Sequence, residues 1–229
     1  MKYKVKHSQP LYRFERKFLV TGLNTDEIEA LVNINSLMFN YSYQRRTINN
    51  IYFDDFNFSN YHANVEGATD RIKIRIRWYG EPFDAHQNPK LEIKIKKGLL
   101  GSKETLKLKG FNLNEDLSDL FRPLENSYIY KRYSLDSVSP VLLNSYSRSY
   151  YISNDKSYRI TIDDCQSYFK IGKRDNSFLH KVDDRHSKIL EIKYNDEFDD
   201  NVNYITNNLP FRMTKNSKYV NGIDSIYSY

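Results

Sequence analysis

Charged and apolar side chains alternate strictly in the segment that most constrains how this chain can fold. Residues 70–79 read D-R-I-K-I-R-I-R-W-Y, which places four cations on one face and three isoleucines and a tryptophan on the other. A period of two belongs to a β-strand, because successive side chains of a strand point to opposite faces. The segment therefore predicts a strand with one charged face and one apolar face.

The same alternation recurs along the chain, now with acids among the basic residues. It is found in residues 13–17, 90–96, 159–163 and 191–193. On a single strand the pattern is typical of a wet sheet face, where opposite charges pair across neighbouring strands. Its recurrence on five or six strands predicts a sheet with a charged concave face that holds a polyanion.

The order of the predicted elements favours an antiparallel sheet. Strands are predicted at residues 12–20, 46–54, 70–79, 90–97, 102–109, 140–152, 157–164 and 187–194. Amphipathic helices are predicted at residues 25–36, after Asn114 and at about 196–208, whereas residues 54–60 read as a turn and the tail from residue 213 has no assigned element.

Strands that follow one another with few helices between them pair antiparallel. Closing such a sheet removes its exposed edges and turns the charged faces inward. We therefore expect an α+β fold, an antiparallel closed β-barrel or tunnel with a charged lumen, flanked by a few helices. Residues 1–229 are expected to form a single domain.

Composition narrows the partners and the compartment. Aromatic residues make up 15% of the chain, which argues against disorder. The net charge of +6 favours phosphate-rich partners without choosing among nucleic acid, nucleotide and polyphosphate. Cys165 is the only cysteine, so no intramolecular disulfide can form. Without a signal peptide or a membrane-length apolar stretch, we expect a soluble, cytoplasmic protein with no membrane segment.

Many cations share the charged faces of the predicted strands. They are Lys17, Lys73, Arg75, Arg77, Lys94, Lys103, Lys107, Arg148, Arg159 and Lys193. Burying so many like charges is prohibitive unless water or an anion compensates them. Arginine offers phosphate a planar fork and lysine offers a point charge, so the set suits a chain of phosphates in a wet or anion-filled tunnel.

Four acids lie on the same faces, namely Glu15, Glu92, Asp163 and Glu191. A divalent metal between carboxylate and phosphate accounts for acids in a phosphate site, and we expect Mn²⁺ or Mg²⁺. No nucleic-acid partner is expected, because these acids would repel a phosphate backbone in the absence of metal.

Eight short motifs carry a resemblance to a known family. They are R-F-E-R-K-F at 13–18, I-Y-F-D at 51–54, R-I-R-W-Y-G at 75–80, L-E-I-K at 91–94 and 190–193, Y-S-R at 146–148, R-I-T-I-D at 159–163 and K-N-S-K-Y at 215–219. These motifs, and their order along the chain, resemble the polyphosphate polymerase domain of the vacuolar transporter chaperone (VTC) complex, within the CYTH or triphosphate tunnel superfamily.

The resemblance implies a metal-dependent enzyme, an ATP-polyphosphate phosphotransferase that moves the terminal phosphate of ATP to a growing polyphosphate chain. Residues assigned to catalysis are Arg75, Arg77, Lys94, Arg148, Arg159 and Glu191. Residues assigned to phosphate binding are Lys17, Lys73, Lys103, Lys193, Lys215 and Lys218. Glu191 and Glu15 are the expected metal ligands, and Tyr146 is expected to contact the nucleotide base.

One departure from the superfamily bears on the reaction. The first strand usually reads E-x-E-x-K, whereas here Arg13 precedes Glu15 and Lys17. Loss of the first glutamate argues against a simple triphosphatase, and the arginine resembles the VTC type. The alternatives are a metal-dependent tri- or polyphosphatase and a non-catalytic module that binds polyphosphate or nucleotide.

Overall fold

A computed structural model describes residues 13–84, 88–98 and 100–227. Its sheet contains nine antiparallel strands, paired in the order β1-β9-β7-β6-β2-β3-β4-β5, with β8 beside β7. The strands are β1 (Arg13–Val20), β2 (Asn40–Asp54), β3 (Asp70–Tyr79), β4 (Lys90–Lys97), β5 (Leu100–Lys107), β6 (Ser139–Ile152), β7 (Tyr158–Lys170), β8 (Lys181–Asp184) and β9 (Lys188–Asn195).

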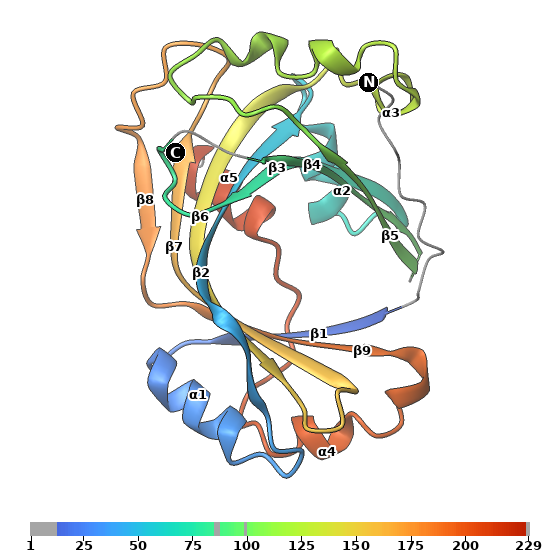
Figure 1. Ribbon diagram of the computed structural model, residues 1–229, viewed down its shortest axis with the longest axis vertical. Coiled ribbons are helices and arrows are strands. Elements are labelled where there is room, and N and C mark those ends of the chain that lie inside the picture. Colours follow the sequence, from blue (N-terminus) through green and yellow to red (C-terminus); the bar gives the residue numbers. More distant parts are fainter. Residues whose placement is uncertain (1–12, 85–87, 99, 228–229) are drawn as a thin grey trace.

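The sheet curls without closing. Figure 1 shows β1 and β9 lying across from β3, β4 and β5, with β7, β6 and β2 joining the two sides. β1 and β5 end the strand path, and no pairing joins them within the described residues. The antiparallel α+β prediction is confirmed, but the expected closed barrel is corrected to a curled sheet that stays open between these two strands.

Helices cover parts of this sheet. They are α1 (Thr25–Asn33), α2 (Ser59–Val65), α3 (Tyr128–Arg132), α4 (Asn203–Thr206) and α5 (Lys218–Tyr227), with 3₁₀ turns at Leu117–Asp119, Arg122–Leu124 and Asp196–Phe198. α1 begins at a capping box in which Asn24 accepts from the Glu27 amide and Glu27 accepts from the Asn24 amide. These two bonds satisfy amides that the first helical turn leaves unpaired.

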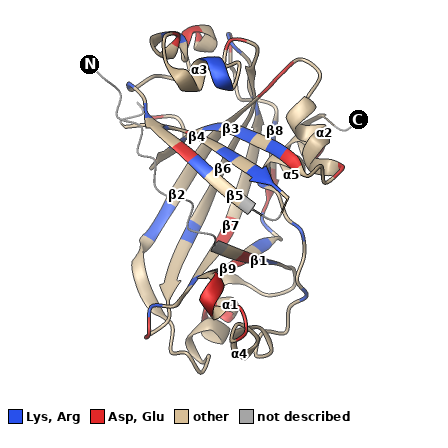
Figure 2. Ribbon diagram, turned by 90° about the vertical axis from the view of Figure 1, so that its right-hand side faces the viewer, with Lys and Arg blue, Asp and Glu red and all other residues tan. Residues whose placement is uncertain are grey.

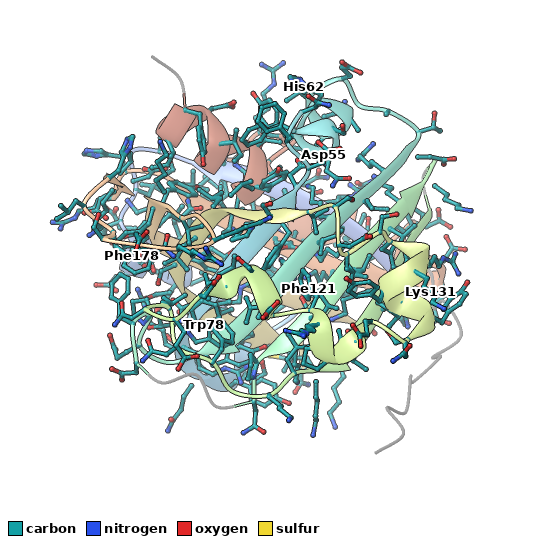
Figure 3. The ribbon with its side chains drawn as sticks, turned by 90° about the horizontal axis from the view of Figure 1, so that it is seen from above. Asp55, His62, Trp78, Phe121, Lys131 and Phe178 are labelled. Carbon is teal, nitrogen blue, oxygen red and sulfur yellow. The ribbon has the colours of Figure 1, made fainter. Side chains whose placement is uncertain are left out.

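The convex face of the sheet is apolar, as the alternation predicts. Ile76 and Trp78 of β3 pack beneath residues 111–135, in a cluster that also contains Phe121. Figure 3 looks onto that segment, with Phe121 and the exposed Lys131 labelled. A second apolar cluster lies between α1 and strands β1, β7 and β9. Burial of these faces leaves the charged positions on the concave side.

Several element boundaries differ from the predictions. β2 begins at residue 40, six residues before the predicted start, and the helix expected after Asn114 is replaced by two 3₁₀ turns. Pro123 lies in the second turn and cannot donate the amide bond that a longer helix requires. The helix expected at 196–208 is a 3₁₀ turn followed by the four-residue α4. α2, α3, α5 and β8 were not predicted.

Candidate functional site

Glu92 on β4 is the centre of one group of charges on the concave face. Arg75 Nη2 lies 2.5 Å and Arg75 Nε 2.9 Å from Glu92 Oε2, while Lys103 Nζ lies 2.9 Å from Oε1. Arg77 Nη1 is 3.8 Å away. Cross-strand pairing produces this arrangement, because Arg75 on β3 is the direct partner of Glu92. Burial by itself would raise the pKa of Glu92, but the charges of Arg75, Arg77 and Lys103 lower it, so the carboxylate is ionised.

Asp163 on β7 is the centre of a second group and is completely buried. Arg148 on β6 donates to both of its carboxylate oxygens, with Nη2 2.6 Å from Oδ2. Lys218, the first residue of α5, places Nζ 2.5 Å from the same Oδ2. Although burial opposes ionisation of Asp163, the two cations hold the pKa of its carboxyl well below the usual value.

A third group joins β1 to β9. Lys193 Nζ lies 2.9 Å from Glu191 Oε1 and 3.8 Å from Glu15 Oε1, and Lys17 Nζ lies 3.6 Å from the same oxygen of Glu15. Burial by itself would raise the pKa of Glu15, but Lys17, Lys193 and then Lys94 lower it to about 2. Both carboxylates of this group therefore meet on one ammonium group.

The three groups face one another across the curled sheet. The pKa of Lys94 on β4 is well below its ordinary value, first because of the charge of Arg75 and then because of burial, with further contributions from Lys193 and Lys17. β4 and β1 are far apart along the strand path, so this coupling requires the curl seen in Figure 1. Figure 2 shows the basic and acidic positions along these strands. The charges therefore converge.

The segment before α5 crosses from β1 to β3. The Thr214 amide donates to the Lys17 carbonyl oxygen at 2.8 Å, and Lys17 Nζ donates to the Asn216 carbonyl oxygen at 3.3 Å. Lys73 Nζ on β3 donates to Ser217 Oγ at 2.9 Å. This crossing carries Lys218 into the centre of the charged face.

Cations outnumber acids within the site. Nine cations take part, namely Lys17, Lys73, Arg75, Arg77, Lys94, Lys103, Arg148, Lys193 and Lys218. Four carboxylates face them, those of Glu15, Glu92, Asp163 and Glu191. Burial and like charges lower the pKa values of several of the lysines, with that of Lys73 falling to about 7. The site is therefore suited to a ligand with several negative charges.

Three of the residues assigned to the site from the sequence take part in none of the ion pairs described above. Arg159 and Lys215 are exposed and form no ion pair in the described part of the chain, so their roles stay predictions. Tyr146 is buried, accepts a hydrogen bond from Arg77 at 3.2 Å, and has Lys218 and Arg148 over its ring. Its contact with a nucleotide base also stays a prediction, in a position that lies among the phosphate-binding candidates.

Glu92 and Asp163 were expected on the charged faces but were assigned no individual role from the sequence. Each lies directly opposite an arginine in the ladder, Arg75 for Glu92 and Arg148 for Asp163. That pairing could be found only once the strand register was known, because alternation shows which face a residue is on and not what stands beside it.

Glu15 and Glu191 are the expected ligands of the divalent metal that the resemblance implies, and both lie in the third group of charges. Among the described residues, no group of three His, Cys, Asp or Glu side chains is arranged to hold a metal ion. The two glutamates converge on Lys193, and Glu191 Oε1 is buried without a hydrogen bond. Mg²⁺ is commonly held by one or two carboxylates together with substrate phosphates, so the pair fits a metal that is bound jointly with a phosphate ligand.

The fold defines a class of protein in which a curled antiparallel sheet carries an excess of cations on its concave face. The chain belongs to the VTC family, since residues 12–227 match the VTC domain. None of the curated proteins matches the chain. No helix in the described ranges is both long enough and apolar enough to cross a membrane.

Three solved structures share the fold, each with a TM-score of 0.50. A candidate adenylate cyclase from Vibrio parahaemolyticus is 11% identical, with 92% of this chain and 97% of that chain aligned. The PH1819 protein from Pyrococcus horikoshii OT3 is 15% identical, with 91% and 96% aligned. A candidate adenylate cyclase from Bacillus halodurans is 16% identical, with 92% and 96% aligned. At these identities the likeness concerns the fold alone.

Proposed function

We propose that this chain is a metal-dependent polyphosphate polymerase that transfers the terminal phosphate of ATP to a growing polyphosphate chain. The observation that carries the proposal is the convergence of nine cations with only four carboxylates on one concave face. A linear polyanion would supply the missing negative charge. Membership of the VTC family supports the same reaction.

The side chains of the site would act by position and charge. Glu92 holds Arg75 and Asp163 holds Arg148, so both guanidinium groups are oriented before a ligand arrives. An arginine has five N–H donors, and those that do not contact the carboxylate are left for phosphate oxygens. Phosphoryl transfer depends largely on such positioning and on neutralising charge around the moving group.

Glu15 and Glu191 would hold the divalent metal, Mn²⁺ or Mg²⁺. Such a metal supplies charge neutralisation at the phosphate oxygens that it contacts. The ammonium group of Lys193 already lies between the two glutamates. On metal binding it would either move toward the phosphates or share the two carboxylates with the metal. The negative charges of the two glutamates are already compensated by Lys17, Lys193 and Arg148. The site would therefore accept a metal cation most readily when an anionic phosphate ligand binds with it.

The test is to incubate the purified chain with ATP and Mn²⁺ and to size any polymer on a gel. Long polymer is expected from the unmodified chain. Arg77→Gln is expected to abolish it and remain folded, because Glu92 keeps Arg75 and Lys103 as partners. Glu191→Gln, which conserves shape and removes the charge, is expected to abolish the metal-dependent product.

Arg122→Gln serves as the matched control, since it removes one positive charge from an exposed pair with Asp119 on the outer segment. It should leave polymer formation unchanged. Release of free phosphate without polymer would replace the polymerase by the phosphatase. Tight binding of polyphosphate with no nucleotide turnover would leave only the binding module.

A further inference from the structure

Arg46 on β2 is a cation that the charged groups described above do not include. Its guanidinium carbon lies 4.8 Å from the ring centres of Tyr79 and Tyr150 and 5.3 Å from that of Tyr43. Its Nε is buried without a hydrogen-bond partner. Arg45, its neighbour in sequence, pairs with Asp164, whereas no acid of the described chain forms an ion pair with Arg46.

Arg46 extends the charged concave face beyond Arg77 and Arg148. It is the direct partner of Arg148 in the β2–β6 ladder, so both side chains lie on the concave face. Tyr79 follows Arg77 by two residues on β3, and Tyr150 follows Arg148 by two residues on β6. Each tyrosine therefore lies about 7 Å further along the same face than its arginine.

This end of the face is open to solvent. Tyr43 is 64% exposed and Tyr79 is 47% exposed, whereas Arg75 in the middle of the site is 7% exposed. Tyr43 is also the ladder partner of Tyr150, which completes the aromatic set around Arg46. A chain of phosphates held by the inner arginines would pass this group on its way out.

The chemistry of the group favours an anion. Aromatic rings attract a guanidinium through their quadrupole and hold it in place, but they do not neutralise its charge. The N–H groups at the edge of the fork can then bind phosphate oxygens in a charge-assisted contact. The inner arginines already contact carboxylates, whereas Arg46 has no such counter-charge.

We propose that Arg46, held by Tyr43, Tyr79 and Tyr150, is an outer anion subsite that binds phosphates of a linear polyphosphate beyond those held by Arg75, Arg77 and Arg148. The inference rests on the proposed function only in taking polyphosphate as the ligand, and it requires no turnover. Its consequence is that affinity depends on chain length, because only a chain long enough to reach β2 at residue 46 gains this contact.

The experiment compares the binding of inorganic tripolyphosphate with that of linear polyphosphate tens of phosphates long, at one fixed salt concentration. Arg46→Gln is expected to lower affinity for the long polymer about tenfold, the value of one charge-assisted hydrogen bond, and to leave tripolyphosphate binding unchanged. Arg46→Lys keeps the positive charge but loses the planar fork, so its affinity for the long polymer should lie between that of the unmodified chain and that of Arg46→Gln. Arg122→Gln is the control for loss of one positive charge at an exposed site.

An equal loss of affinity for both ligands would place Arg46 among the inner arginines and overturn the inference. Unchanged affinity of Arg46→Gln for both ligands would also overturn it. A selective loss of ATP binding in Tyr79→Leu, with polyphosphate binding intact, would overturn it as well, because that result would indicate a base-stacking site. Failure of the unmodified chain to bind either phosphate ligand would instead defeat the proposed function. Tyr41→Leu tests the specificity of the tyrosine effect, because Tyr41 is 61% exposed and its ring packs at a tilt against Tyr151, which belongs to the apolar cluster under α1.

Discussion

Lys218 Nζ lies 2.5 Å from Asp163 Oδ2 and so ties the first residue of α5 to the middle of β7. The contact joins residues 55 apart in the sequence, and both side chains are almost completely buried. This contact makes the beginning of α5 part of the site. Asp163 holds two cations in a position where a phosphate could replace it as their counter-charge.

Asp163→Asn is expected to destabilise the unliganded protein and to make it more dependent on anions. Removing one partner of a buried ion pair costs about 3–5 kcal/mol, because the remaining charges, here Arg148 and Lys218, are left uncompensated. Tripolyphosphate should restore part of that loss. The measurement is the melting temperature with and without the ligand.

Asp119→Asn is the matched control, since Asp119 pairs with Arg122 at an exposed site and should change stability little. A larger ligand-induced rise in melting temperature for Asp163→Asn than for the control supports the assignment. Equal rises would show that Arg148 and Lys218 do not contact the anion.

Lys94→Met is expected to separate stability from binding. Arg75 and then burial hold the pKa of Lys94 well below its ordinary value, so the charged ammonium is unfavourable in the unliganded protein. Removing it should raise the melting temperature and lower the affinity for tripolyphosphate. Lys97→Met, at the exposed end of the same strand, should change neither quantity. A stability loss in Lys94→Met would contradict the electrostatic argument.

The strands could be predicted from the sequence, whereas their assembly could not. The alternation in residues 70–79 correctly identified β3 and its charged face, because a period of two has no other common cause. Closure could not be predicted in the same way, since alternation says nothing about whether β1 reaches β5. α5 was missed because its composition is polar, although Tyr219, Ile223 and Ile226 share one buried face.

The candidate site could be predicted where the strands are regular. Arg75, Arg77 and Lys94 were found because β3 and β4 keep an unbroken register. Arg46 was missed because the β2–β6 pairing shifts register between Tyr41 and Tyr43 and again between Tyr43 and Arg46. Each such bulge moves the following side chains to the other face, so the period of two that identifies a charged face is lost there.

Lys73 predicts a proton uptake on ligand binding. Burial, followed by the charges of Lys17 and Arg75, lowers its pKa to about 7 from 10.5, while Glu15 acts in the opposite direction. A bound phosphate would favour the charged form and raise the pKa again. At pH 8, binding of tripolyphosphate should therefore take up protons, which calorimetry in buffers of different ionisation enthalpy measures. Lys73→Met should lower the uptake.

The same residue gives a direction for stability without ligand. Because the folded pKa of Lys73 lies below the unfolded value, the unfolded chain binds more protons between about pH 7 and 10.5. The contribution of Lys73 to folding stability is therefore least favourable below pH 7 and improves as the pH rises through that window. Lys73→Met should flatten this part of the profile. An unchanged slope in the variant would assign the pH dependence to other groups.

Gly222→Ala is expected to displace α5 and with it Lys218. A Cβ atom at residue 222 would lie 2.4 Å from Leu142 Cδ2 and 2.6 Å from Tyr168 Cδ1, which is too close for either side chain to remain in place. An exposed helical Gly→Ala change is stabilising, but overpacking against a buried sheet face costs about 1–3 kcal/mol. Chemical denaturation should therefore show a loss of stability, and tripolyphosphate binding should weaken because Lys218 moves from Asp163. Unchanged affinity in a destabilised variant would mean that the position of α5 does not control the cations of the site.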